Sequence, residues 1–222
     1  DMVDIDWVNI NYLSVGHWTG FTDSLSGIGE YEYSLGLSPG QTQMVAWTSA
    51  KPDTTITVSA SLTEGPTYYA NVRAVDSVSN VGGLISSDGF GLDVSSPITG
   101  NVYDGFGEDL TWTNIIDSIW ANWDGYSDLY SGISFYETAV GTSPGGQNTV
   151  SWVSADTNIS TSHAELSLEH GSTYYCSVRA TDVVDNVSST GTSNGITIDT
   201  LSPVINLMAE TSSEDPLFQG SD

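Results

Sequence analysis

Short apolar stretches, each followed by polar turn residues, run along the whole chain. Between Tyr68 and Val75, small or apolar side chains occupy every second position, and mostly polar side chains lie between them. This period of two is typical of a strand with one buried face. Glycine, serine, threonine and asparagine interrupt such stretches about every 8–12 residues, which is typical of β-sandwiches and β-barrels. The pattern therefore predicts an all-β protein.

Seven segments of this kind occupy the first part of the chain. We expect strands at residues 4–9, 12–18, 29–36, 42–48, 54–62, 67–76 and 88–94. Seven short strands within about 100 residues are the number found in an immunoglobulin-like sandwich.

The chain also matches itself. Trp18 and Trp123 lie at the same repeat position, 105 residues apart, and after one inserted residue Tyr68 and Tyr174 match at an offset of 106. Further matched pairs are Asp23 and Asp128, Tyr31 and Tyr136, Trp47 and Trp152, Arg73 and Arg179, Asp76 and Asp182, and Asn80 and Asn186. A period near 100 residues exceeds that of solenoid repeats, about 20–50 residues, and is the size of a domain with its own core. The sequence predicts tandem sandwich modules.

The repeat sets the expected boundaries. We predict module 1 at residues 1–97, module 2 at residues 98–203 and the beginning of a third module at residues 204–222. Module 1 has no counterpart of residues 101–105, so its N-terminal strand is expected to be incomplete. Ser202-Pro203 repeats Ser96-Pro97, which supports a third module. We expect the chain to be a fragment of a longer array.

The stretch from Leu62 through Gly65 to Tyr68 precedes alternating small apolar residues. It resembles the corner between the fifth and sixth strands of fibronectin type III domains, where a tyrosine hydroxyl bonds back to the upstream backbone. The resemblance covers both modules and implies two tandem seven-stranded fibronectin type III-like or immunoglobulin-like sandwiches. Trp18 and Trp123 fall where that family places its core tryptophan. The structural core residues that we expect are Trp18, Trp123, Tyr68, Tyr174 and Cys176.

The wider pattern of both modules, Trp-x-Gly-aromatic-x-Asp and later Ala-x-Asp-x-x-x-Asn, resembles tandem modules of large secreted or cell-surface proteins. This resemblance implies an extracellular location. It says little about a specific role, because one fold hosts many binding functions.

Charge excludes several partners. The chain carries a net charge of −25 and three basic residues, Lys51, Arg73 and Arg179. Such a surface repels phosphate backbones and anionic lipids, so we expect no nucleic-acid partner and no membrane-surface binding. No apolar run approaches the roughly 18 residues of a membrane-spanning helix, so direct membrane insertion is not expected.

Catalytic chemistry finds little support among the reactive side chains. Cys176, the only cysteine, falls on the apolar side of its strand, where a thiol behaves as a small hydrophobic group. His17, His163 and His170 have no counterparts in the other module and lack the spacing of metal ligands or of a catalytic triad. We expect no enzyme activity.

Several acidic residues are expected to meet where module 1 joins module 2. In a fibronectin-like sandwich, the loop with Asp128 and the loop with Asp182 and Asp185 share one end of the module. Asp93 leaves the last strand of module 1 toward that end, and Asp104 is expected nearby. Calcium prefers about 6–8 oxygen ligands. The sequence predicts a calcium site at the junction, formed by Asp93, Asp104, Asp128, Asp182 and Asp185.

The same residue types also organise loops without a metal. Aspartate and asparagine side chains accept hydrogen bonds from backbone N–H groups two residues later and so fix turns. We assign this role to Asp23, Asp76, Asn80 and Asn186. Two interpretations stay open: loop organisation with no cofactor, or a bound calcium ion.

Arg73 and Arg179 share one repeat position on the polar side of their strands. Glu32 and Glu137 fall on the polar side of the neighbouring strand. We predict the cross-strand ion pairs Arg73–Glu32 and Arg179–Glu137, each contributing about 0.2–1 kcal/mol because both ends stay wet.

Four further tryptophans, Trp7, Trp47, Trp112 and Trp152, also recur between the modules. Packing is the favoured interpretation, whereas exposed indole faces would indicate binding of sugar rings or of a protein partner. Asn158 and Asn186 begin Asn-x-Ser sequons, which accept glycans in a eukaryotic secretory pathway. In a chain rich in serine and threonine, chance matches are the stronger explanation.

These features predict non-catalytic extracellular modules that act as a spacer, a stalk or an adhesin-type structural array. Calcium at the junction is the expected rigidifying cofactor, and neighbouring modules of the same parent chain are the expected partners. The alternatives are a carbohydrate- or protein-binding module that uses exposed aromatics or loops, and a subunit of a surface filament.

Overall fold

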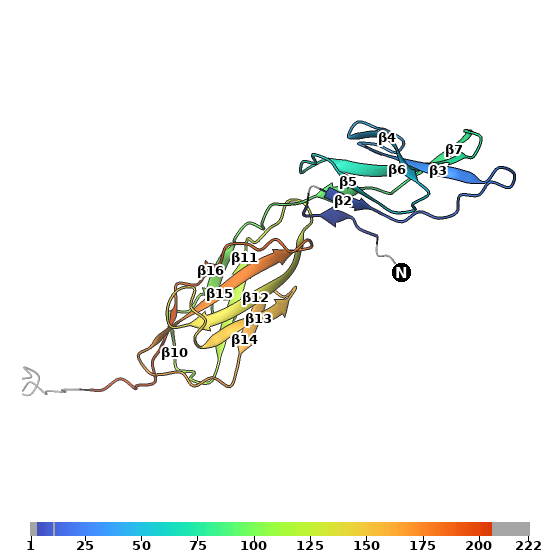
Figure 1. Ribbon diagram of the computed structural model, residues 1–222. Helices are drawn as coiled ribbons and strands as arrows, with labels where there is room; N and C mark the ends of the chain where they lie inside the picture. Colours follow the sequence, from blue (N-terminus) through green and yellow to red (C-terminus); the bar gives the residue numbers. More distant parts are fainter. Residues whose placement is uncertain (1–3, 11, 206–222) are drawn as a thin grey trace, which may run out of the picture.

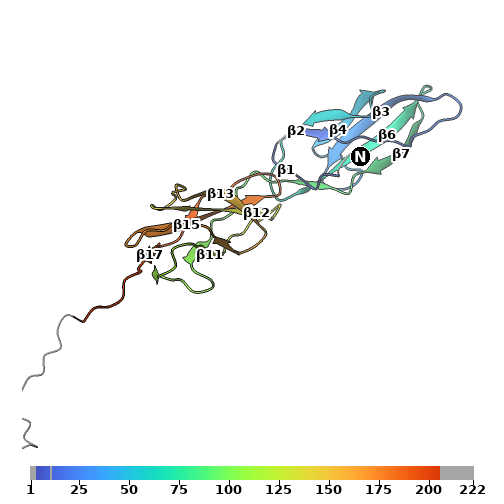
Figure 2. The same cartoon turned by 90° about the horizontal axis from the view of Figure 1, so that it is seen from below.

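The computed structural model describes residues 4–10 and 12–205. Two β-structured units follow one another end to end along an elongated molecule, the first drawn in blue to green and the second in green to red (Figures 1 and 2). The described residues form strands and loops, which confirms the all-β prediction. No helix in this part of the chain is long and apolar enough to cross a membrane.

Module 1 contains two sheets. Its larger sheet has the order β1-β8-β6-β3-β4, with β7 also pairing with β6, and its smaller sheet pairs β2 with β5. The strands are β1 (Trp7–Val8), β2 (Tyr12–Val15), β3 (Ile28–Gly36), β4 (Val45–Lys51), β5 (Ile56–Ser59), β6 (Thr67–Asp76), β7 (Val81–Ser86) and β8 (Phe90–Leu92).

Module 2 repeats this arrangement and adds a strand. Its larger sheet has the order β10-β17-β15-β12-β13, with β16 beside β15, and its second sheet has the order β14-β11-β9. The strands are β9 (Asn101–Asp104), β10 (Trp112–Thr113), β11 (Ile119–Asp124), β12 (Ile133–Gly141), β13 (Val150–Asp156), β14 (Ser160–His163), β15 (Thr173–Asp182), β16 (Gly191–Thr192) and β17 (Ile196–Ile198). Strand β9 is the one expected to have no counterpart in module 1.

Each of the seven strands expected in module 1 overlaps an observed strand, although several bounds differ by up to three residues, and β7 is an additional strand that the sequence did not predict. The segment Val81–Ser86 contains two adjacent glycines and no clear alternation, so its sequence gives a weak strand signal. It pairs with β6 nonetheless, with Asn71 opposite Ser86. As a result Asn71, expected on the polar face, is buried, and its side chain bonds Ser86 Oγ and the backbone of Gly40 and Gln41.

Each module buries its own tryptophan and tyrosine. The Trp18 ring contacts Tyr31 edge-on at 5.7 Å, and Trp123 contacts Tyr136 in the same way at 5.5 Å. Both tryptophans are buried, as are Tyr68, Tyr174 and Cys176. The core of each module therefore contains the same aromatic pair.

The tyrosine corner forms in both modules. The Tyr68 hydroxyl donates to the Thr63 carbonyl over 2.9 Å and accepts from the Thr63 N–H over 2.8 Å. The Tyr174 hydroxyl accepts from the Glu169 N–H over 3.1 Å. These bonds fix the turn that enters β6 or β15, the strands that end at the acidic loops described below.

The predicted ion pairs are confirmed. Arg73 lies opposite Glu32 in the β3–β6 register, and Arg179 lies opposite Glu137 in the β12–β15 register, each with an N–O distance of 2.7 Å. Each guanidinium also lies over an indole ring, Trp47 at 4.2 Å and Trp152 at 4.5 Å. These two tryptophans therefore pack against arginine on the outer face of the sheet.

Candidate metal centre at the module junction

Module 1 and module 2 meet through backbone, amide and aromatic contacts. Asn9 Nδ2 donates to the Val184 carbonyl over 2.5 Å, and Asn186 Nδ2 of module 2 donates to the Asp93 carbonyl over 3.3 Å. The Trp7 and Tyr130 rings lie 6.5 Å apart. Trp7 faces Gly91 on the neighbouring strand, where a Cβ atom would lie 2.4 Å from its ring, so any larger residue at that position would displace the indole.

Three carboxylates converge at this junction. Asp93 follows β8, Asp128 lies in the loop between β11 and β12, and Asp182 ends β15. One oxygen of each lies within 4.8 Å of the others. Asp93 is 0% exposed and Asp182 is 1% exposed, while Asp128 is partly buried. The group thus combines two fully buried carboxylates from different modules.

Backbone N–H groups orient all three carboxylates. Asp93 Oδ1 accepts from Ser95 N–H over 3.1 Å, and Asp93 Oδ2 accepts from Ser131 N–H of module 2 over 3.0 Å. Asp128 Oδ1 accepts from the N–H groups of Tyr130 and Gly132 over 3.0 and 2.9 Å. A carboxylate offers about four lone-pair positions, so each group keeps acceptor capacity.

Asp182 is held by its own loop. Its Oδ1 accepts from the N–H groups of Val184 and Asn186 over 2.9 and 2.8 Å, and its Oδ2 accepts from Asn186 Nδ2 over 2.8 Å. Asn186 Nδ2 also donates to the Asp93 carbonyl over 3.3 Å, across the junction. Both hydrogens of this amide are therefore engaged, and a glycan on the Asn186 sequon would displace these bonds.

No basic side chain neutralises the group. Arg73 and Arg179 are paired with Glu32 and Glu137, and Lys51 is exposed at the end of β4. These are the three basic residues of the chain. The Ser131 hydroxyl oxygen, next to the amide that bonds Asp93, is buried without a hydrogen-bond partner.

Two of the five predicted calcium ligands lie outside this group. Asp104 ends β9, where the chain has run about 20 Å from Ile98 at roughly 3.3 Å per residue. There its Oδ2 accepts from Gly195 N–H over 2.9 Å. Asp185 is exposed and adopts a left-handed backbone conformation with φ of 69°, which makes the loop turn. Neither lies with the three junction carboxylates.

Asp104 has an unusual environment of its own. It is fully buried, its Oδ1 has no hydrogen-bond partner, and burial raises its pKa to about 6. The neighbouring Cys176 thiol is also buried, and burial raises the pKa of that thiol well above its ordinary value. A thiol that stays protonated is a poor nucleophile, which agrees with a structural role for Cys176.

The loop-organising bonds expected in module 1 are present. Asp23 Oδ1 accepts from the N–H groups of Leu25, Ser26 and Gly27 over 2.7–3.1 Å. Asp76 bonds Asn80 through both the backbone N–H and the side-chain amide, each over 2.7 Å. The Gly27 N–H bond lowers the pKa of Asp23, and the Asn80 amide lowers the pKa of Asp76. Asp128 and Asp182 make the equivalent bonds, so loop organisation and a shared carboxylate group occur together.

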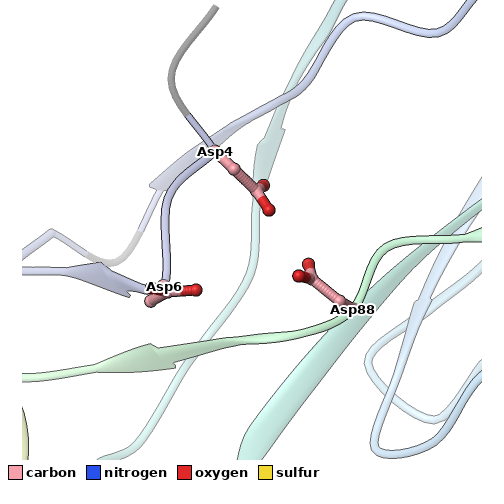
Figure 3. A group of neighbouring side chains, drawn as sticks. All are labelled: Asp4, Asp6 and Asp88. Atoms are coloured by element: carbon pink, nitrogen blue, oxygen red, sulfur yellow. The ribbon is translucent and has the colours of Figure 1, made fainter.

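A second acidic group, not expected from the sequence, lies on module 1. The carboxylates of Asp4, Asp6 and Asp88 converge at the start of the first strand and before β8 (Figure 3), with oxygens within 4.8 Å of one another. All three residues are exposed. A comparison of the two modules could have pointed to this group, because the residue at the Asp88 position differs between them. Asn194 occupies the position of Asp88 in module 2, where its amide donates to Asp109 over 2.9 Å.

The remaining predicted residues lie apart from both groups. His163 is buried against the Thr138 hydroxyl, and burial lowers its pKa, whereas His17 and His170 are exposed. Asn158 is exposed, and its amide donates to the Ala155 carbonyl over 2.9 Å. Trp112 departs from the packing interpretation, because it is 62% exposed.

No protein-family model and no curated protein matches the chain. Among solved structures, it is similar to the fibronectin(III)-like modules of Clostridium thermocellum CbhA, with 17% identity and a TM-score of 0.42 over 89% of this chain and 90% of that one. It is also similar to the chicken CNTN1 FN1–FN3 domains, with 13% identity and a TM-score of 0.42 over 86% and 64% of the two chains. It is similar to titin domains A168–A170 as well, with 15% identity and a TM-score of 0.42 over 78% of this chain and 56% of that one.

The strand order agrees with the expected fold. In module 2, β14-β11-β9 forms one sheet and β10-β17-β15-β12-β13 the other, so the chain contains tandem sandwiches of the fibronectin type III-like and immunoglobulin-like kind. Modules of this fold are commonly non-catalytic structural or binding repeats.

Proposed function

We propose that these modules form a rigid extracellular spacer, and that a calcium ion bound by Asp93, Asp128 and Asp182 holds neighbouring modules in a fixed orientation. The observation that carries the proposal is the burial of two carboxylates from different modules against a third, without a basic side chain beside them.

The spacing of the group suits calcium. Calcium–oxygen distances of about 2.3–2.6 Å allow two ligands of one ion to lie up to roughly 5 Å apart. The three oxygens lie within 4.8 Å of one another. The buried Ser131 hydroxyl, which has no partner, adds a neutral oxygen next to Asp93. Water and carbonyl oxygens would complete the coordination shell.

Electrostatics favours a cation at this position. A buried charge is costly unless it is paired, hydrogen-bonded or coordinated to a metal. Hydrogen bonds from backbone N–H groups orient these carboxylates but carry no full positive charge. A divalent ion would offset two of the three negative charges and turn repulsion between the modules into attraction.

The connection between the modules is short and partly ordered. Pro97 is buried, and Ile98 pairs with Ser127 of the adjacent loop directly after it. Two further hydrogen bonds join the modules, because Asp93 accepts from the Ser131 N–H and from the Asn186 side-chain amide. A short linker with several contacts restricts bending, which is the property a spacer requires.

The proposal includes an extracellular location. The net charge of −25 keeps the chain soluble and attracts divalent cations. A calcium site of moderate affinity, built from few protein ligands, would be filled where calcium is abundant, as in extracellular modules with dissociation constants of about 10⁻⁴–10⁻³ M.

Calorimetric titration with calcium and small-angle scattering test this function together. We expect one calcium site of moderate affinity per chain, and a narrower distribution of molecular dimensions in calcium than in EDTA. Asp93→Asn should abolish both effects. Asp88→Asn, which changes the exposed group of module 1, is the matched control and should leave the junction response intact. Scattering curves that are identical in calcium and EDTA, with no heat from the junction, would exclude the proposal.

A further inference from the structure

The surface of module 1 that contacts module 2 is repeated on module 2 itself. Trp7, Asn9 and Asp93 contact or join the next module. Their repeat counterparts in module 2 are Trp112, Asn114 and Asp199. We call these three residues the distal surface, because they lie at the end of module 2 opposite the junction.

The distal surface has the same backbone scaffold as its counterpart. Strand β10 pairs in parallel with β17, with Trp112 opposite Thr197, as β1 pairs in parallel with β8. The Asp199 N–H donates to the Thr113 carbonyl over 2.8 Å, just as the Asp93 N–H donates to the Val8 carbonyl over 2.8 Å.

The Asp199 carboxylate accepts the same local hydrogen bond as the Asp93 carboxylate. Asp199 Oδ1 accepts from the N–H two residues later, on Leu201, over 3.0 Å. Asp93 Oδ1 accepts from the N–H of Ser95 over 3.1 Å. The backbone bonds of the distal surface are therefore in place, while the predicted third module, residues 204–222, lies almost entirely outside the described residues.

Exposure distinguishes the two surfaces. Trp112 is 62% exposed, whereas Trp7 is partly buried beside Tyr130. The Asp199 side chain is 52% exposed, whereas Asp93 is fully buried. Pro203 is exposed, whereas its counterpart Pro97 is buried. Trp7, Asp93 and Pro97 are thus more buried at the junction than their counterparts are at the distal surface, whereas Asn9 and Asn114 are both exposed.

The opposite end of module 1 repeats the complementary surface. Asp23 and Asp76 occupy the positions of Asp128 and Asp182, with the same loop bonds. Leu25 occupies the position of Tyr130, the residue that meets Trp7, and is 97% exposed. The chain thus has the two halves of a junction at its two ends, in addition to the complete junction between its modules.

We propose that the distal surface is a docking site for a further module of this same repeat, which presents the loops equivalent to those of Asp128 and Asp182. Trp112 packs on the residue at the Tyr130 position, Asn114 donates to the carbonyl at the Val184 position, and Asp199 completes a second three-carboxylate group. The carboxylate part rests on the proposed calcium junction. The Trp112 and Asn114 contacts do not depend on it.

One position sets the second junction apart from the first. Glu64, which accepts bonds from Val94 N–H and Ser95 Oγ, is replaced by His170. His170 Nδ1 accepts from Thr200 N–H over 3.1 Å and lies 3.8 Å from Asp199 Oδ1. His170 therefore bonds the backbone just after Asp199, as Glu64 bonds the backbone just after Asp93, and both contacts fix the segment that follows the last strand of the module.

A three-module chain tests the docking. The test protein consists of residues 1–203 followed by a second copy of residues 98–203. The indole N–H resonance of the first Trp112 is assigned by its loss when that copy alone carries Trp112→Ala. We expect this resonance to shift, and its relaxation by a soluble paramagnetic reagent to fall several-fold, relative to the original chain. The Trp152 indole, which lies under Arg179 in both proteins, is the internal control.

The outcomes separate this inference from the proposed function. Protection of Trp112 in EDTA as well as in calcium would support docking while excluding calcium as its cause. A Trp112 that stays equally accessible in the three-module chain would overturn the docking site, even if calcium orders the first junction. Protection of Trp112 by oligosaccharides, with none from the added module, would also overturn it and assign the surface to sugar.

Discussion

The two acidic groups of this molecule have the same composition and opposite surroundings. Each consists of three aspartates whose oxygens lie within 4.8 Å of one another. At the junction, two of the three are fully buried and come from different modules, whereas Asp4, Asp6 and Asp88 are all exposed on module 1. The difference teaches that burial, more than the number of charges, determines how strongly such carboxylates repel one another.

Physical magnitudes support this distinction. Two unit charges 4 Å apart interact by about 1 kcal/mol in water and by about 4 kcal/mol at an effective dielectric constant of 20. Water and mobile counterions therefore moderate the repulsion among Asp4, Asp6 and Asp88. At the junction, the same repulsion is weakly screened and acts directly on the contact between the modules.

The largest expected effect is the response of the junction to calcium. At calcium concentrations about 100 times the dissociation constant, binding should raise the free energy of unfolding by about 2.7 kcal/mol. Asp93→Asn should remove this gain, because a buried ligand and its charge are lost. In EDTA, Asp93→Asn should be at least as stable as the original chain, because the variant lacks one of the buried charges that repel one another. Chemical unfolding of the original chain and of Asp93→Asn, each in calcium and in EDTA, measures these differences. An equal gain in stability from calcium in the two proteins would contradict a role for the buried group in binding the ion.

Asp104 shows how a buried carboxyl behaves without neighbouring metal ligands. Burial raises its folded pKa to about 6, above the ordinary value of 3.8, so the folded state binds this proton more tightly than the unfolded state. Its contribution to stability should therefore be complete below about pH 4 and be lost as the pH rises through 6, a change of about 2–3 kcal/mol.

Asp104→Asn provides the measurement. The difference in unfolding free energy between the variant and the original chain, taken from pH 4 to pH 8, isolates this one group from the other acids. We expect the variant to gain relative stability as the pH rises. A difference that stays constant over this range would show that Asp104 ionises normally in the folded protein.

Ser131→Ala should have a smaller effect confined to calcium affinity. If its buried hydroxyl is a ligand, the loss of one neutral oxygen should weaken binding by about 1 kcal/mol, or several-fold in the dissociation constant. Stability in EDTA should change little, because this hydroxyl has no hydrogen-bond partner to lose. Titration calorimetry of the variant checks this, and an unchanged affinity would remove Ser131 from the proposed coordination shell.

Asp88→Asn should have the smallest effect. It introduces the amide that module 2 has at this position, where Asn194 donates to Asp109. We expect a gain of about 0.5 kcal/mol at low ionic strength, decreasing with added salt and independent of calcium. Thermal unfolding at two salt concentrations measures it. A strong dependence on calcium would instead indicate that the exposed group binds the ion.

The fold was predictable because its signals are local and repeated. The alternation after Tyr68 and the recurrence of Trp18 as Trp123 identified a sandwich, and the sandwich brought Asp128 and Asp182 to one end. Strand β7 was missed because its glycines hide the alternation, and its pairing with β6 is what buries Asn71. Side-chain burial at such positions depends on neighbouring strands that a single segment does not reveal.

The candidate site was only partly predictable for a similar reason. Asp93, Asp128 and Asp182 follow from the placement of loops, whereas Asp104 depends on how far β9 runs before it ends. The exposed group was missed because Asp4 and Asp6 meet Asp88 only through the parallel pairing of β1 with β8. Comparing the modules residue by residue would have marked it, since Asp88 replaces the asparagine that serves as a donor in module 2.

The parallel pairing of β1 with β8 also determines how an array would respond to pulling. Tension enters module 1 at the start of β1 and leaves at the end of β8, so it acts along both strands in opposite directions. The bonds from Gly91 N–H to the Asp6 carbonyl and from Asp93 N–H to the Val8 carbonyl, each 2.8 Å long, are then loaded in shear and at the same time. Strands β10 and β17 repeat this geometry in module 2, so every unit of a stretched chain would resist force through the same short clamp.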